Sequence, residues 1–213
     1  MAVLTEPENK RQLVALIVED LYNNTVFPMN ADCSRKLIIT GEDPTPIELT
    51  KSCKIRREDL RTTHEEADNI LAQQMVLVAR EPNTGVSVIS DDTDVFVILL
   101  YYYQKLNLTT VVIKDSPVQE RTTIDIRATV NEHKDIIPDL PAAHALTGSD
   151  TTAGYFGIGK GTAVKVLRSQ KSTLNSVGDF SCNFEDVLQE STRFIAECYI
   201  VTMEEANMSS MRR

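Results

Sequence analysis

Segments with helical periodicity alternate along this chain with short runs of strand-forming residues. Residues 86–90 form a β-rich run that suits a central strand, and residues 95–103 form a strongly apolar run that suits a buried helix. Such alternation predicts an α/β domain with a mainly parallel sheet flanked by helices. Other helices are expected at residues 8–23, 127–134, 138–147, 160–169 and 184–207, and other strands at 36–40, 109–114 and 122–126.

The length of 213 residues suits one domain, or a domain with a helical appendage, with a core of its own. No apolar run approaches the roughly 20 residues that span a bilayer, and the N-terminus lacks the apolar stretch of a signal peptide. The four cysteines are widely spaced, which is typical of reduced thiols. We therefore expect an intracellular protein with no membrane partner.

Carboxylates gather at three places that an α/β fold would bring to one rim of its sheet. Glu66 and Asp68 lie at the start of an expected helix, Asp92 and Asp94 follow the central strand, and Asp150 precedes a glycine-rich segment. Carboxylates held close together repel one another unless cations neutralise them, and oxygen ligands suit Mg²⁺ or Mn²⁺. The three clusters therefore predict a metal site.

Each cluster also has a simpler interpretation. Asp92 could cap the helix that follows it, and Asp150 could close an Asx-turn. Glu66 and Asp68 would be favoured at a helix start by the helix dipole alone, by about 0.3–1 kcal/mol each. Both can point at one metal only if the helix begins at or just after Glu66. His144 is interpreted as a structural histidine rather than a catalytic one.

A glycine-rich segment follows Asp150, and its residues 157–163 read Gly-Ile-Gly-Lys-Gly-Thr-Ala. A glycine turn that leads into a helix offers backbone N–H groups to a phosphate. The spacing from Gly154 to Lys160 also approaches that of a Walker A loop, but Gly161 stands where Ser or Thr would coordinate Mg²⁺. No nucleotide cofactor is expected.

In order and spacing, these motifs resemble the flap endonuclease and XPG-type nuclease superfamily, which has a PIN-like fold. The same series of motifs is also similar to that of a set of mobile-element-related animal proteins with a PIN-like core. The resemblance implies a PIN-like α/β fold with a helix-two-turn-helix. The matching elements, within about residues 62–170, are Glu66-Ala67-Asp68, Ser90-Asp91-Asp92-Thr93-Asp94, Gly148-Ser149-Asp150 and residues 157–163.

The activity that the resemblance implies is metal-dependent hydrolysis of phosphodiesters in structured or single-stranded nucleic acid. Asp92, Asp94 and Asp150 would be the catalytic residues. Together with Glu66 and Asp68, they would hold two Mg²⁺ or Mn²⁺ ions. The expected partner is DNA rather than RNA, and the expected location is nuclear.

The resemblance also implies a second contact with the nucleic-acid backbone, away from the cut. Gly157, Gly159, Lys160 and Thr162 would make it. The net charge of −9 disfavours indiscriminate binding, because affinity for phosphates comes mainly from Lys and Arg. Two divalent ions would add four positive charges where the phosphate lies, so the acidic balance does not exclude a nuclease.

The chain departs from the family pattern at its N-terminus. The family opens with a buried strand that carries a catalytic Asp, whereas this chain opens with a helix and offers only Asp43, beside Pro44. We therefore expect an N-terminally incomplete sheet, with a partial-sheet region at 1–61, a nuclease-like core at 62–170 and a helical region at 171–213. Two alternatives stay open: a catalytically inactive nucleic-acid or protein-binding module, and a truncated mobile-element remnant.

Overall fold

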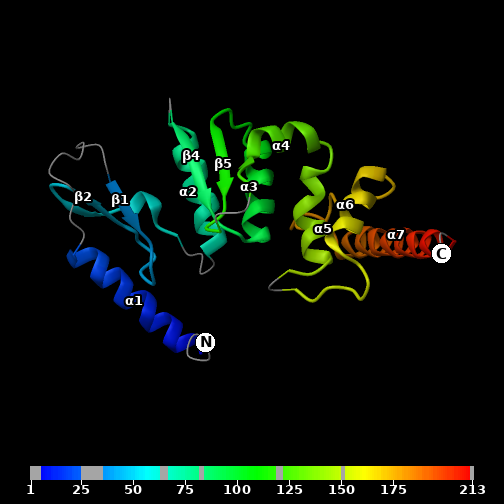
Figure 1. Ribbon diagram of the computed structural model, residues 1–213, viewed down its shortest axis with the longest axis horizontal. Coiled ribbons are helices and arrows are strands. Elements are labelled where there is room, and N and C mark those ends of the chain that lie inside the picture. The colour runs from blue at the N-terminus through cyan, green and yellow to red at the C-terminus, as the bar shows by residue number, and fades with distance from the viewer. Residues whose placement is uncertain are drawn as a thin grey trace. The chain divides into compact units, whose positions relative to one another are not determined.

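The computed structural model describes residues 6–24, 36–62, 67–81, 84–118, 122–149 and 152–211 (Figure 1). It divides into two compact units, Met1–Ile70 and Leu71–Arg213, and the boundary falls inside one continuous helix, α2 (Ala67–Ala79). The described residues form seven α-helices and two three-stranded sheets. The expected α/β class is therefore confirmed, while the finer division at residues 61/62 and 170/171 stays a prediction.

The first unit contains helix α1 (Pro7–Asn24) and an antiparallel sheet, which is followed by the short helix η2 (Glu58–Leu60). The sheet has the order β1 (Lys36–Ile39), β2 (Ile47–Thr50), β3 (Lys54–Arg56). The sequence predicts α1 and β1 but not the β2–β3 hairpin. All residues of β3 are exposed at the sheet edge, so this strand lacks the alternating pattern that reveals a half-buried strand.

The second unit is built on a mixed sheet of β4 (Gly85–Ile89), β5 (Val111–Asp115) and β6 (Ile124–Asp125). β4 and β5 pair in parallel, and helix α3 (Thr93–Lys105) makes the crossover between them. β5 and β6 pair antiparallel. The carboxyl ends of β4 and β5 therefore lie at one edge of the sheet, which is where ligands bind in open α/β folds.

The expectation of a mainly parallel sheet is wrong, because only β4 and β5 pair in parallel among the strands that the structure describes. Connection length explains the difference. A parallel connection needs a dozen or more residues, usually including a helix. Among the described residues of these connections, only the one between β4 and β5 contains a helix. The other connections are short, and the chain turns back on itself.

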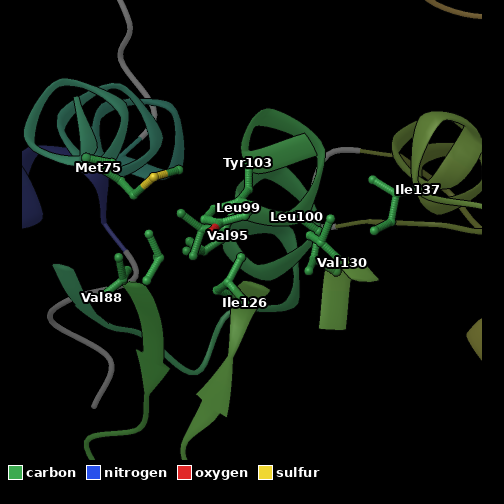
Figure 2. Packing of buried hydrophobic residues seen from close by; sticks show 11 residues of the cluster. Met75, Val88, Val95, Leu99, Leu100, Tyr103, Ile126, Val130 and Ile137 are labelled. Carbon is green, nitrogen blue, oxygen red and sulfur yellow. The ribbon is translucent and has the colours of Figure 1, made fainter. Parts of the chain in front are cut away.

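Helix α3 forms the centre of the main core. Its residues Val95, Leu99 and Tyr103 repeat at the four-residue spacing of one helix face and are at most 3 % exposed. Figure 2 shows this face directed toward Met75 of α2 and Val88 of β4. The packing fixes α3 against α2 and the sheet, and with it the position of the first turn of α3.

The remaining helices are α4 (Ile126–His133), α5 (Leu140–Leu146), α6 (Lys160–Ser169) and α7 (Phe184–Met211), with the short helix η3 (Ile137–Asp139) before α5. All four α-helices lie where the sequence predicts them. α6 contacts both α5 and α7, around a second core cluster that includes Ala143, Val166, Phe194 and Cys198. None of the described helices is both long and apolar enough to cross a membrane.

Candidate metal centre

Asp92 and Asp94 lie at the start of α3, just beyond the carboxyl end of β4. Asp92 is the N-cap of the helix, and its Oδ1 accepts the Asp94 N–H at 2.8 Å. Its own N–H donates to Ser90 Oγ at 3.0 Å. The interpretation of Asp92 as a helix cap is therefore confirmed. A carboxylate has two oxygens with about four lone-pair sites, so a cap can also bind a metal.

The third carboxylate comes from α2. Asp68 lies in the first turn of this helix, where the helix dipole favours a negative charge. The same continuous helix places Met75 in the core around α3. Asp68, Asp92 and Asp94 each offer one carboxylate oxygen, and these three oxygens lie within 4.8 Å of one another. We call these three residues the acidic triad.

The acidic triad fits a divalent cation in chemistry and in size. Mg²⁺ and Mn²⁺ prefer hard oxygen ligands, and all three donors here are carboxylates. Opposite ligands of an octahedral Mg²⁺ ion lie about 4.2 Å apart, at twice the usual Mg–O distance of about 2.1 Å. The limit of 4.8 Å on the separations of the triad oxygens lies close to that span. All three residues are half-buried, so water screens their mutual repulsion only in part.

Three of the five ligands expected from the sequence are thus brought together. Glu66 and Asp150 lie outside the described residues, so their part in the site stays a prediction. The described part of helix α2 is Ala67–Ala79. A helix start that lets Glu66 and Asp68 serve one metal therefore stays a prediction as well.

A histidine from α5 contacts the acidic triad. His144 Nε2 lies 2.6 Å from Asp94 Oδ1, and the His144 side chain is only 10 % exposed. The bond restricts the orientation of the Asp94 carboxylate. The sequence predicts a structural role for His144 but not this contact. No local signal indicates it, because the two residues lie 50 positions apart in the sequence.

Lys160 of α6 is occupied within the protein. Its ammonium donates to the carbonyl oxygens of His144, at 2.7 Å, and of Gly148, and it lies 3.3 Å from Thr147 Oγ1. It therefore satisfies carbonyl groups at the C-terminal end of α5. Burial lowers the pKa of Lys160, and the negative charge of Asp94 opposes that shift. Contact between Lys160 and a nucleic-acid backbone stays a prediction.

The other residues expected to bind nucleic acid lie at the start of α6. Gly157 has φ +79°, and Gly159 is the N-cap of the helix. A Cβ atom at either glycine would meet no other heavy atom within 4 Å, so the backbone is open to a close approach there. Thr162 is half-buried in the first turn of the helix.

A buried cation lies near the carboxyl end of β4. Lys114 of β5 is 8 % exposed, and its ammonium donates to the Ser90 carbonyl oxygen at 2.5 Å. It also lies 5.9 Å from the centre of the Phe96 ring. Sequence reasoning missed this residue, because a lysine in a short β-rich run is ordinarily a solvent-exposed strand residue. Its hydrogen-bond partner Ser90 comes directly before Asp91 and Asp92 in the chain.

The loop that contains Asp150 is closed by two glycines. Gly148 has φ +94°, and a Cβ atom there would lie 2.8 Å from the Gly154 Cα. The Ser149 N–H donates to the Thr152 carbonyl oxygen at 3.1 Å, and Thr152 Oγ1 donates to the Ala145 carbonyl oxygen at 2.8 Å. The residues on both sides of Asp150 are therefore held against the end of α5.

Two glycine substitutions are expected to change stability in opposite directions. Gly148→Ala should lower the free energy of unfolding by about 2 kcal/mol or more, because it combines a left-handed φ with a backbone clash. Gly161→Ala should raise it by up to about 0.5–1 kcal/mol, because the site lies in α6 with open space around it. Urea unfolding of both variants checks this. Equal effects would contradict the close approach of Gly148 to Gly154.

Comparison of the chain with protein-family models, curated proteins and solved structures finds no match.

Proposed function

We propose that this protein is a metal-dependent nuclease that hydrolyses phosphodiesters with Mg²⁺ or Mn²⁺ at the acidic triad. The observation that carries the proposal is the convergence of Asp68, Asp92 and Asp94 from two different helices. Asp92 and Asp94 lie beyond the carboxyl end of a strand, where α/β folds bind ligands. Half-buried carboxylates so close together favour a cation over an empty site.

The residues of the chain have separate tasks in this proposal. Asp68, Asp92 and Asp94 would hold the metal, which when bound supplies an activated water and stabilisation of the leaving oxygen. Asp92 is held in place by its bond to the Asp94 N–H. His144 holds the Asp94 carboxylate in a fixed orientation, which preserves the spacing of the ligands.

The proposal includes the finer features that the resemblance implies. The fold would be PIN-like, and α5, the loop after it and α6 would form the helix-two-turn-helix. Glu66 and Asp150 would complete a set of five carboxylates for two ions. The open backbone at Gly157 and Gly159 supports contact with a phosphate backbone. DNA is the proposed substrate, in structured or single-stranded form.

A second candidate function is nucleic-acid binding without cleavage. The contact between His144 and Asp94 favours it, because a side chain of the protein already occupies one carboxylate oxygen of the triad without a metal. Such a module would bind nucleic acid equally well in EDTA and would show no turnover.

Cleavage assays on flap, hairpin and single-stranded substrates, as DNA and as RNA, test the proposed function. The wild-type protein should cut at least one substrate with Mg²⁺ or Mn²⁺ and none in EDTA, and Asp92→Ala should lose this activity. Equal cleavage by the wild type and Asp92→Ala would refute the assignment. Binding that survives EDTA, with no cleavage under any condition, would favour the second candidate.

A further inference from the structure

A cavity of about 300 Å³ lies beside the acidic triad. It is lined by residues of α3, α4, α5 and α6, which are neighbouring helices of the second unit (Figure 1). Its wall includes Thr93, which stands between the two triad residues of α3, and His144, which bonds to Asp94. The cavity and the triad therefore share a wall. Its volume is at the lower end of the range of small-molecule sites, about 300–1,000 Å³.

The body of this cavity is apolar. Phe96, Val97 and Leu100 line it from α3, Leu140 from α5 and Val164 from α6. None of the five is charged, and Phe96 contributes an aromatic ring. A ligand that enters this space must therefore present apolar faces.

Two separate polar groups interrupt the apolar wall. One is the pair His144 and Lys160, next to the triad. The other is the pair His133 and Arg168, whose Nδ1 and Nη2 atoms lie 3.4 Å apart. Lys160 begins α6 and Arg168 lies two turns further along, roughly 12 Å away at 1.5 Å per residue. The two polar groups are therefore so far apart that a ligand must extend beyond a single ring to reach both.

The polar group at Arg168 has a mixed charge. His133 and Arg168 also line an adjoining hollow of about 90 Å³, together with Glu132 and Asp135. Acids and bases beside each other do not favour a second anion. They offer hydrogen-bond donors and acceptors, which suit a neutral group with both kinds of atom along its edge.

We propose that the cavity receives one unpaired nucleobase of a strand whose phosphate lies at the acidic triad. A base is flat, with apolar faces and an edge of donors and acceptors. Its faces contact Phe96, Leu100 and Val164, and its edge meets His133 and Arg168. This inference rests on the proposed function and narrows its substrate to unpaired nucleotides. Removing a base from a duplex costs a few kcal/mol, and the cost is least in a single strand.

Fluorescence of a single-stranded DNA with one 2-aminopurine tests base entry with Ca²⁺ as the cation, which neutralises the acidic triad where the phosphate lies, while cleavage is followed separately with Mg²⁺. Binding of the wild-type protein should raise the 2-aminopurine emission several-fold, because the base leaves its stacked neighbours. Val164→Phe, which fills the cavity, and Arg168→Gln, which removes an edge contact, should each abolish most of the rise. Arg193→Gln makes the same charge change at an exposed site on α7 and should leave it unaltered.

The outcomes separate this proposal from the proposed function. A strand that binds by anisotropy with no emission change, or equal emission with wild type, Val164→Phe and Arg168→Gln, would overturn base entry. The emission would also stay unchanged if the natural occupant of the cavity were an apolar protein segment. The base proposal is also overturned if no strand binds. Base entry without metal-dependent cleavage would support the proposed base-binding cavity and refute the proposed nuclease activity. Cleavage without base entry would support the nuclease activity and refute the base-binding cavity. Arg168→Gln changes an exposed residue, so the test does not depend on whether Val164→Phe folds.

Discussion

Asp92→Asn is expected to lower metal-dependent cleavage at least about 1,000-fold while the protein stays folded. Asn caps helices as well as Asp does, so the bond from the Asp94 N–H is retained and only the negative charge is lost. A bound metal supplies several kcal/mol of transition-state stabilisation, and each 1.36 kcal/mol is tenfold in rate. Initial rates with saturating Mn²⁺, together with a thermal melt of the variant, measure the two effects separately.

The matched control is Asp125→Asn. Asp125 is the N-cap of α4, where its Oδ1 accepts the Ala128 N–H at 3.0 Å. The substitution makes the same change, at the same kind of position, outside the acidic triad. It should leave the cleavage rate unchanged. An equal loss of rate in both variants would mean that helix capping or net charge, rather than metal binding, explains the effect.

Metal binding can be measured without any substrate. A ligand that binds only the folded state stabilises it by about 2.7 kcal/mol at 100 times its Kd. Mn²⁺ should therefore raise the melting temperature of the wild type and of Asp125→Asn but not that of Asp92→Asn. A shift of the same size in all three proteins would place the ion elsewhere. This result would count against the acidic triad even if the protein cut nucleic acid.

The elements of the fold that could be predicted from the sequence are those with a strong local pattern. Helix α3 follows from nine consecutive apolar or aromatic residues at 95–103, and β4 from the β-branched run before it. The β2–β3 hairpin has no such pattern, because the exposed strand β3 consists of Lys54, Ile55 and Arg56. The direction of strand pairing depends on contacts between distant residues. Only the lengths of the connections could have indicated it, and they favour hairpins.

The residues of the candidate site also divide into those that a local sequence pattern predicts and those that it does not. Asp92 and Asp94 could be predicted because the strand, the carboxylates and the helix are adjacent in sequence. Asp68 could be predicted only conditionally, since its direction depends on the residue at which α2 begins. The contacts of His144 and Lys114 follow from packing across the fold and have no local signal. Lys160 stood in a motif typical of phosphate binding, yet its ammonium contacts the end of α5.

Phe194→Ala is expected to lower the free energy of unfolding by about 3–5 kcal/mol. Phe194 lies in α7 with no exposed surface, in the cluster that also contains Val166 and Leu167 of α6. Removing a buried aromatic ring loses its transfer free energy and leaves a cavity. Domains of this kind are stable by only about 5–15 kcal/mol, so the loss is a large fraction of the total. Urea denaturation followed by circular dichroism measures it.

Phe180→Ala is the matched control for this change, because Phe180 is fully exposed. The same atoms are deleted, but no packed contact is lost, so stability should change by less than about 0.5 kcal/mol. The two variants should also differ in cleavage. α6 contacts both α5 and α7, and Lys160 at its start bonds to the helix that carries His144. Loosening α7 should therefore release the support of Asp94, and Phe194→Ala should lose activity at temperatures where Phe180→Ala keeps it. Equal stability of the two variants would contradict the packing of α7 on α6.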